Sequence, residues 1–318
     1  KLGFETSLPV EIFQDGSTTV FCDKLLGILR NLPEGEIEFE QKEGKLYIKP
    51  RFKKVSFQLK SISSDKFPEL QAIQDDSFFE ISQSELSEMI SQTVFAVSDD
   101  ETRYFMNGVF LERKENSLAM VATDGRRLSY IVKPAGEGIG TFEGIIIPPK
   151  ILMLVKKYLT GEGTIQMAVS DKNVFFKIGN QKYYSNLIEG QFPNYSRVIP
   201  QEQLYRISLN KEDIAEALKR VSILVEQKSR RIYLRLSQDL LLLDAEESDI
   251  GTAKEEIICQ YSGPDITIAL NYLYLYEPLR VIAEDVIILE FSEPTKAITL
   301  KSEPYNEYFH IVMPMQVE

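Results

Sequence analysis

The fold follows from one stretch of the sequence, I-I-I-P-P-K-I-L-M-L-V-K-K-Y-L-T-G-E-G at residues 145–163. It runs from an apolar strand end through an amphipathic helix to a glycine-containing turn. Similar stretches occur at 18–35 and 268–283. Anchored on Val20, Ile146 and Ile268, the three copies are 126 and 122 positions apart. Self-similarity at a nearly fixed period indicates repeated structural units, so we predict three similar domains.

Three full units of this length would need more residues than the 318 of the chain. The first unit lacks its opening half, and the sequence begins at Lys1 in an alternating pattern that reads as a strand already under way. We therefore expect about fifty N-terminal residues to be absent from this numbering. The predicted domains are residues 1–76, with the N-terminal half missing, 77–202 and 203–318.

Hydrophobic periodicity predicts the helices. Apolar residues recur at helical spacing in 148–160, as Ile151, Leu154, Val155 and Tyr158, and in 210–225, as Ile214, Leu218, Val221 and Val225. Asn210 is placed to cap the second helix, and Ser82 with Glu85 offers a capping box for another. Alternating runs between the helices predict many short strands. Because strands and helices do not alternate regularly, the pattern indicates an antiparallel α+β fold.

The composition excludes several classes of protein. The chain has one histidine, His310, and two cysteines, Cys22 and Cys259, that form no CxxC pair. A zinc site or a histidine-dependent triad is therefore not expected, and we predict neither a metal nor a cofactor. No run reaches the roughly 18 apolar residues that span a bilayer, and the cysteine usage fits a reducing cytoplasm, so we expect a cytoplasmic protein without a membrane partner. The net charge of −12 repels nucleic acid on average, so any DNA contact has to be local.

Asp124 is the residue that most resembles a catalytic group. It lies in A-T-D-G-R-R-L (122–128) beside Arg126 and Arg127, which is compatible with an acidic α+β enzyme acting on an anionic substrate. The other interpretation is a strand that leads into a tight turn, where Asp-Gly supplies the backbone freedom. We favour the turn, because no partner carboxylate or metal-ligand cluster is marked elsewhere. We therefore predict no catalytic residue and no enzyme.

The C-terminal stretch Phe309–Met315 is unusually apolar for a chain end. Such an end normally frays unless it is docked. Part of it is expected to be a final core strand, whose pairing stops at Pro314 because proline has no N–H to donate. Met313 and Met315 are flexible side chains of the kind used on adaptable binding surfaces. The stretch therefore predicts a binding surface.

The sequence resembles the bacterial DNA polymerase III beta subunit family, the replicative sliding clamps, in four motifs. They are R-Y-F-M-N-G (103–108), A-T-D-G-R-R-L (122–128), F-P-N-Y-S-R-V-I-P (192–200) and V-M-P-M (312–315). The resemblance implies a head-to-tail homodimeric ring around double-stranded DNA, with helices lining the hole and antiparallel sheets outside. It implies a processivity factor that tethers the replicative polymerase alpha subunit, the clamp loader, repair and translesion polymerases and mismatch-repair proteins. A non-replicative ring or scaffold would differ only in its partners.

The resemblance also assigns residues to the DNA and to the dimer seam. The residues that would face DNA, whatever its base sequence, are Lys24, Arg30, Arg103, Tyr104, Lys150, Lys156, Lys157, Lys219, Arg220 and Arg280. The loop with Arg103 and Tyr104 also carries Asp100, an acid where a neutral polar group would be expected. Apolar pairs at the seam would be Phe57 with Leu59 and Ile223 with Leu224, for which a plain core role stays open.

A pocket between the second and third domains would bind short partner peptides. The positions that match the family are Arg103, Met106, Thr123, Gly125, Arg126, Arg127, Leu128, Pro193, Arg197, Val198, Asn271, Tyr274, Ile311, Val312, Met313, Pro314 and Met315. Leu128, Val198, Ile311 and Met313 would form a cavity for leucine or phenylalanine anchors, and Arg103, Arg127 and Arg197 would donate to acidic groups around it. Two departures could shift peptide preference. Arg126 stands where many relatives carry histidine, and Gln316-Val317-Glu318 replaces the usual short basic-apolar ending.

Overall fold

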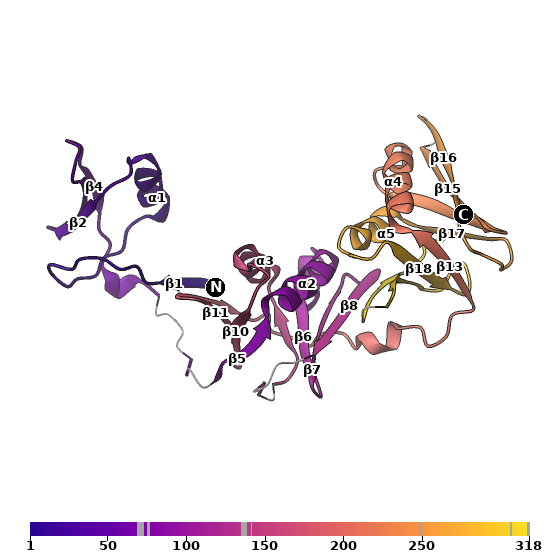
Figure 1. Ribbon diagram of the computed structural model, residues 1–318, viewed down its shortest axis with the longest axis horizontal. Helices are drawn as coiled ribbons and strands as arrows, with labels where there is room; N and C mark the ends of the chain where they lie inside the picture. Colours follow the sequence, from indigo (N-terminus) through magenta and orange to yellow (C-terminus); the bar gives the residue numbers. More distant parts are fainter. Residues whose placement is uncertain are drawn as a thin grey trace. The chain divides into compact units, whose positions relative to one another are not determined.

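The computed structural model describes residues 1–68, 73–74, 77–134, 139–140, 142–247, 250–305 and 307–316 (Figure 1). The chain divides into a small unit, Ser7–Ala72, and a large unit formed by Lys1–Thr6 together with Ile73–Glu318. Within the described ranges, every pair of neighbouring strands is antiparallel, and helices accompany the sheets. The predicted antiparallel α+β fold is confirmed.

In residues 7–68, the described part of the small unit, there are one α-helix and one three-stranded sheet. Its elements are α1 (Cys22–Asn31), β2 (Ile37–Lys42), β3 (Lys45–Pro50), β4 (Phe57–Lys60) and the 3-10 turn η1 (Ser64–Lys66). The sheet order is β2-β3-β4, so β4 is an edge strand. Leu46 and Ile48 are buried on β3, which shows the period of two expected when one face of a strand is covered.

The large unit repeats one topology. After β1 (Leu2–Thr6), residues 77–202 form β5 (Phe79–Ser82), α2 (Gln83–Thr93), η3 (Val94–Ala96), η4 (Glu101–Met106), β6 (Val109–Lys114), β7 (Ser117–Thr123), β8 (Arg127–Pro134), β9 (Ile145–Ile147), α3 (Pro149–Tyr158), β10 (Thr164–Val169), β11 (Asn173–Ile178), β12 (Gln181–Asn186) and η5 (Tyr195–Val198). Later residues form β13 (Tyr205–Asn210), α4 (Lys211–Val221), η6 (Ser222–Leu224), β14 (Arg231–Ser237), β15 (Leu240–Glu247), β16 (Gly251–Ile258), β17 (Ile266–Asn271), α5 (Tyr272–Leu279), β18 (Val286–Phe291), β19 (Ile298–Glu303) and β20 (Tyr308–Val312). Apart from the 3-10 turns, both sets run strand, helix, four strands, helix, three strands. The domain boundaries at 76 and 202 stay a prediction, and residue 76 lies outside the described ranges.

The strands of the large unit form three sheets. Their orders are β1-β12-β11-β10-β5, β13-β18-β19-β20-β8-β7-β6-β9 and β16-β15-β14-β17. The eight-stranded sheet takes four strands from each repeat and is continuous because β20 pairs with β8. This joint brings the C-terminal stretch to the start of β8.

The helices of each repeat lie together, α2 with α3 and α4 with α5 (Figure 1). The predicted cap of α4 is confirmed, because Asn210 Oδ1 accepts hydrogen bonds from the backbone N–H of Glu212 (2.9 Å) and Asp213 (3.1 Å). All four predicted stripe residues of α4 and the turn after it are buried. In α3 the prediction is only partly confirmed: Ile151 and Val155 are buried, but Tyr158 is exposed and Leu152 is buried as well.

The predicted capping box at Ser82 is wrong. The Ser82 hydroxyl caps no backbone N–H of α2 and instead makes a hydrogen bond of 2.8 Å with the Ser84 hydroxyl. The buried Gln83 is the residue that anchors the start of α2. Its Oε1 accepts from the Thr160 N–H (2.8 Å), and its Nε2 donates to the Thr164 carbonyl (3.2 Å). The first turn of α2 is thus fixed by tertiary contacts.

None of the described helices is long and apolar enough to cross a membrane. Over the same described ranges, no three His, Cys, Asp or Glu side chains gather into a group that could hold a metal ion. Both cysteines carry free thiols; Cys22 is exposed and Cys259 is buried.

Gly108, at the end of the R-Y-F-M-N-G motif, has no room for a side chain. An added Cβ would lie 2.7 Å from Ile146 Cγ2 and 2.8 Å from both the Ile147 carbonyl oxygen and Ile188 Cδ1. Because one of these atoms belongs to the backbone, Gly108→Ala is expected to lower the free energy of unfolding by about 1–3 kcal/mol. Denaturant titration measures this, with Gly140→Ala as the control. A Cβ at Gly140 meets nothing within 4 Å, so equal stability losses in the two variants would contradict the prediction.

Candidate functional site

The antiparallel joint between β8 and β20 brings together most of the predicted pocket residues. Ile311 lies opposite Leu128, and Val312 lies opposite Arg127. Beyond the strand, the Met313 N–H donates to the Arg126 carbonyl (2.9 Å). After Pro314, where regular pairing has ended as predicted, the Met315 N–H donates to the Ala269 carbonyl at 2.7 Å. The C-terminal stretch is thus docked at both ends, on the 123–128 turn and on β17.

The two faces of this strand pair have different chemistry. Side chains alternate along a strand, so neighbours point to opposite faces. One face carries Leu128 and Ile311, which are buried in one apolar cluster. The other face carries Arg127 and His310, whose contacts are with helical segments and Ser129.

The apolar face has a buried floor and two exposed side chains beside it. The cluster, here called the floor cluster, consists of Val121, Leu128, Ile146, Phe192, Tyr195, Phe309 and Ile311. Val198 belongs to η5, whose Tyr195 is part of the floor cluster, yet its own side chain is 50% exposed. Met313, next to the same strands, is 42% exposed. Exposed apolar side chains beside a rigid apolar floor form a surface on which an apolar anchor of another chain can pack.

The hydrogen bonds of Asp124 stabilise the turn between β7 and β8. Its Oδ1 accepts from the backbone N–H of Arg126 (2.8 Å) and Arg127 (3.1 Å), and its Oδ2 accepts from Arg127 Nε at 3.0 Å. Gly125 has φ of +88°, a left-handed conformation that suits glycine. Both carboxylate oxygens are therefore occupied within the turn. The predicted tight turn is confirmed.

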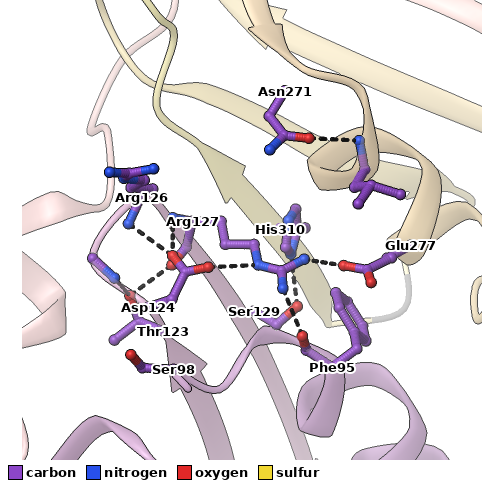
Figure 2. A network of polar contacts seen from close by, with 12 residues as sticks. Phe95, Ser98, Thr123, Asp124, Arg126, Arg127, Ser129, Asn271, Glu277 and His310 are labelled. Carbon is purple, nitrogen blue, oxygen red and sulfur yellow. Dashed lines mark hydrogen bonds and ion pairs between the residues drawn. The ribbon is translucent and has the colours of Figure 1, made fainter. Parts of the chain in front are cut away.

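Arg127 is the centre of the polar network on the opposite face (Figure 2). Besides Asp124, its guanidinium pairs with Glu277 of α5 and donates through Nη2 to the Phe95 carbonyl at 2.7 Å. It also lies over the rings of Tyr274 (4.7 Å to the centroid) and Phe95 (5.6 Å). The Arg127 side chain is only 9% exposed. The resemblance implied that this guanidinium lies at the rim of the pocket; the structure instead buries it on the opposite face of the sheet, against Glu277 and Phe95.

His310 lies next to Arg127 in the same buried layer. Its Nδ1 shares a hydrogen bond of 2.7 Å with the Ser129 hydroxyl, and its ring packs against Phe95 at 5.6 Å between centroids. Burial, helped by the positive charge of Arg127, lowers the pKa of His310 to about 3. The imidazole is therefore neutral at physiological pH, and its role here is structural.

Arg103 reaches the 123–128 turn from η4, a 3-10 segment here also called the Arg103 loop. Asp100 caps this loop by accepting from the Thr102 N–H (2.9 Å), and it pairs with Arg103 Nε (2.8 Å). These hydrogen bonds lower the pKa of the Asp100 carboxyl, and those from Thr102 have the largest effect. A Cβ on Gly125 would lie 2.8 Å from Arg103 Nη1, so the guanidinium lies against the turn. The unexpected acid at position 100 thus holds Arg103 in place.

The other predicted pocket residues differ in exposure. Arg126 and Arg197 are exposed, and within the described part of the chain neither side chain has an ion-pair partner. Met106 and Thr123 are buried, and Pro193 is half-buried. Asn271 caps α5 by accepting from the Leu273 N–H (3.0 Å). Gln316 is exposed, whereas Val317 and Glu318 lie outside the described ranges.

The predicted DNA-facing cations in the large unit lie on α3, on α4 and just after α5. Lys150 and Lys157 are exposed, and Lys156 is half-buried. Lys219 pairs with Glu216, and Arg220 makes a bidentate pair with Glu255 at 2.6 and 2.9 Å. Lys219 and Arg280 also line a groove of about 510 Å³ between α4 and α5. In the small unit, Lys24 and Arg30 lie on α1, and Lys24 lies 3.5 Å from the neighbouring Asp23 carboxylate. Tyr104, on the loop of Arg103, is exposed.

The predicted seam residues lie at or beside edge strands. Phe57 and Leu59 are half-buried on β4. Ile223 is 73% exposed, and Leu224 lies near the start of β16, since a Cβ on Gly251 would be 3.6 Å from Leu224 Cδ1. β16 is the edge of its four-stranded sheet and ends at Ile258, which is also strongly exposed.

Comparison with known proteins identifies the family of this chain. Residues 80–194 match the central domain of the DNA polymerase III beta subunit, and residues 196–316 match its C-terminal domain. The beta sliding clamp of Treponema pallidum is 46% identical over 100% of this chain and 87% of its own length. That of Escherichia coli is 26% identical over 97% of this chain and 84% of its own. Crystal structures of the Pseudomonas aeruginosa beta subunit and the Caulobacter crescentus clamp each superpose with a TM-score of 0.94 at 28% identity. Both cover 99% of this chain, and 87% and 86% of their own chains respectively. The chain belongs to the DNA polymerase III beta subunit family, the beta sliding clamps of bacteria.

Proposed function

We propose that this sliding clamp, a DNA polymerase processivity factor, closes around duplex DNA as a head-to-tail homodimer. Its protein partners bind at the surface formed by Val198, Met313 and the floor cluster. The proposed partners are the replicative polymerase alpha subunit, the clamp loader, repair and translesion polymerases and mismatch-repair proteins.

The β8–β20 joint is the observation that carries the partner surface. It fixes Leu128 opposite Ile311 in a buried floor and leaves Val198 and Met313 half exposed next to it. Arg126 and Arg197 are both exposed; Arg197 precedes Val198 in the chain, and the Arg126 carbonyl accepts from the Met313 N–H. An apolar centre with cationic neighbours suits a short peptide that carries an apolar anchor and a carboxylate.

We propose that the chain has no catalytic activity of its own. Both oxygens of Asp124 bind groups of its own turn, so this carboxylate is not free to act on a substrate. No observation favours the alternative of an enzyme that uses Asp124 with Arg126 and Arg127.

Contact with DNA is proposed to be local and independent of base sequence. Lys150, Lys157 and Arg280 are exposed, and within the described ranges none of them pairs with an acidic side chain. Cations of this kind attract phosphates even on a chain whose net charge is −12. Enclosure of the duplex then makes tight contacts unnecessary.

The edge strands support the proposed homodimer. An exposed edge of a sheet presents unpaired N–H and C=O groups. β4, with Phe57 and Leu59, and β16, beside Ile223 and Leu224, are edges of this kind. Head-to-tail association of two copies would pair both kinds of edge and close a ring.

The solution mass tests the seam. The solution mass of the protein is expected to be about twice the 36.4 kDa of one chain. Ile223→Asp is expected to weaken the dimer about 100-fold or more, because a carboxylate replaces an exposed apolar side chain of the proposed seam. Leu204→Asp changes an equally exposed leucine away from the seam and should leave the dimer intact. A wild-type monomer at micromolar concentration, or a dimeric Ile223→Asp variant, would contradict the proposal.

A further inference from the structure

We propose that Arg127 is a positioning residue for the partner surface and does not itself contact the partner. It acts from the opposite face of the sheet, through its ion pair with Glu277. This inference rests on the proposed function, because it concerns how the same surface is held in shape.

The first argument is the direction of the Arg127 side chain. Leu128 and Ile311 belong to the floor cluster on one face of the strand pair, whereas the Arg127 guanidinium contacts Phe95, Tyr274 and Glu277 on the other. All three nitrogens of the guanidinium donate to groups of this chain. With a side chain 9% exposed, little of it is available to a bound peptide.

The second argument is that the Arg127 backbone lies at the centre of the joint. Its carbonyl accepts from the Thr123 hydroxyl at 2.6 Å, and its strand partner is Val312. The carbonyl of Arg126, just before it, accepts from the Met313 N–H. Leu128, just after it, lies opposite Ile311. A shift of Arg127 therefore moves the floor of the surface and the backbone that holds Met313.

The third argument is that β8 and β17 are connected twice, once through residues 313–315 and once through the Arg127–Glu277 ion pair. Residues 313–315 span from the Arg126 carbonyl to the Ala269 carbonyl on β17. β17 leads directly into α5, which carries Glu277, and Glu277 returns to Arg127 (Figure 2). The ion pair thus fixes the spacing between β8 and β17, which residues 313–315 have to bridge. We infer that this spacing sets the position of the Met313 side chain.

Energetics favour a role in positioning. A guanidinium this deeply buried requires its acceptors, so removal of one partner forces the others to rearrange. Coupling of this kind between the two faces of a sheet is expected to change binding at the far face by about tenfold.

The experiment measures binding of a fluorescein-labelled pentapeptide (glutamine, two alanines, leucine, phenylalanine) by fluorescence anisotropy. Glu277→Gln, which keeps the shape of the side chain and removes its charge, is expected to raise the Kd about tenfold. Arg127→Gln is expected to raise it by a similar factor, and the double variant should be no weaker than the weaker single variant. Such non-additivity identifies one shared pathway.

The matched control is Glu290→Gln. Glu290 pairs with Lys301 at 2.7 Å and is 26% exposed, close to the 30% of Glu277, and it lies in the same eight-stranded sheet away from the surface. Loss of the Glu290–Lys301 ion pair should lower the melting temperature and leave the Kd for the peptide unchanged. The control thus distinguishes an effect on the position of the surface from a general loss of stability. An unchanged Kd in Glu277→Gln alongside a weakened Arg127→Gln would overturn the inference, because Arg127 would then affect binding without its ion pair to Glu277. If the wild-type chain binds no peptide, the result contradicts the proposed function itself and not only the role of Arg127.

Discussion

A chain that carries Val198→Asp and Met313→Asp is expected to keep its fold and to bind the partner pentapeptide at least about 100-fold more weakly. The two side chains are 50% and 42% exposed, so a carboxylate at either position can remain in water in the free protein. In the complex the same carboxylates would lie against an apolar anchor. Truncation of a hot-spot side chain at the centre of an interface costs about 2 kcal/mol or more, and every 1.4 kcal/mol is about tenfold in Kd. Fluorescence anisotropy measures the loss.

Exposed residues test this surface better than buried ones do. Leu128 is 2% exposed, and truncation of such a leucine to alanine commonly costs about 2–5 kcal/mol of stability, so lost binding could reflect lost folding. The control is a chain with Met153→Asp and Leu204→Asp, two apolar side chains that lie elsewhere and are at least as exposed, at 50% and 73%. This control should bind the peptide as the wild type does. Equal weakening of both double variants would argue against a specific surface.

Local sequence patterns predicted the structural features that depend on local interactions. The α4 helix is the best example, because its apolar stripe and the cap at Asn210 involve residues that are close in the chain. The turn at Asp124 was predictable for the same reason, since its acceptors bind N–H groups two and three residues on. The pair between Glu216 and Lys219 on α4 also has a helical spacing, although we did not predict it.

Features that depend on distant parts of the chain were not predictable in this way. The direction of the Arg127 side chain depends on the pairing of β8 with β20, which lie far apart in the sequence. Its partner Glu277 is 150 positions away, and no motif marks it. The prediction of a capping box at Ser82 was wrong for a related reason. The start of α2 is held by Gln83, whose partners near residue 160 are distant in the sequence. The resemblance assigned residues to a partner pocket, and the structure separates the exposed ones among them, such as Val198 and Met313, from buried ones such as Leu128 and Ile311.

The second result we expect is a loss of stability in acid that depends on His310. In the unfolded chain this imidazole titrates near its ordinary pKa of about 6.5. In the folded chain its pKa is lowered to about 3, because burial and the nearby charge of Arg127 oppose protonation. As the pH falls below 6.5, the unfolded state takes up a proton that the folded state does not bind. The stabilisation from His310 is therefore complete above pH 6.5 and is lost progressively as the pH falls towards 3.

The size of the effect follows from the gap between the two pKa values. Each pH unit within this window costs about 1.4 kcal/mol, so His310 alone should lower the free energy of unfolding by about 3 kcal/mol between pH 7 and pH 4.5. Urea titrations at several pH values measure the total change, to which paired carboxylates such as Asp100 also contribute. The contribution of His310 is therefore the difference between the wild type and a variant that cannot bind the proton.

His310→Asn is the informative variant. Its amide can occupy the position of Nδ1 and keep the hydrogen bond to Ser129, but it does not titrate in this range. The variant is expected to be less stable than the wild type at pH 7, where it loses ring contacts with Phe95, and to lose less stability on acidification. Ser129→Ala serves as the control, because it breaks the same hydrogen bond while leaving the imidazole in place, so its pH dependence should follow that of the wild type. Because the carboxylates are identical in all three proteins, a smaller pH dependence confined to His310→Asn can come only from the buried imidazole. Parallel curves for the wild type and His310→Asn would mean that the folded protein accommodates the protonated ring, in conflict with its burial beside Arg127.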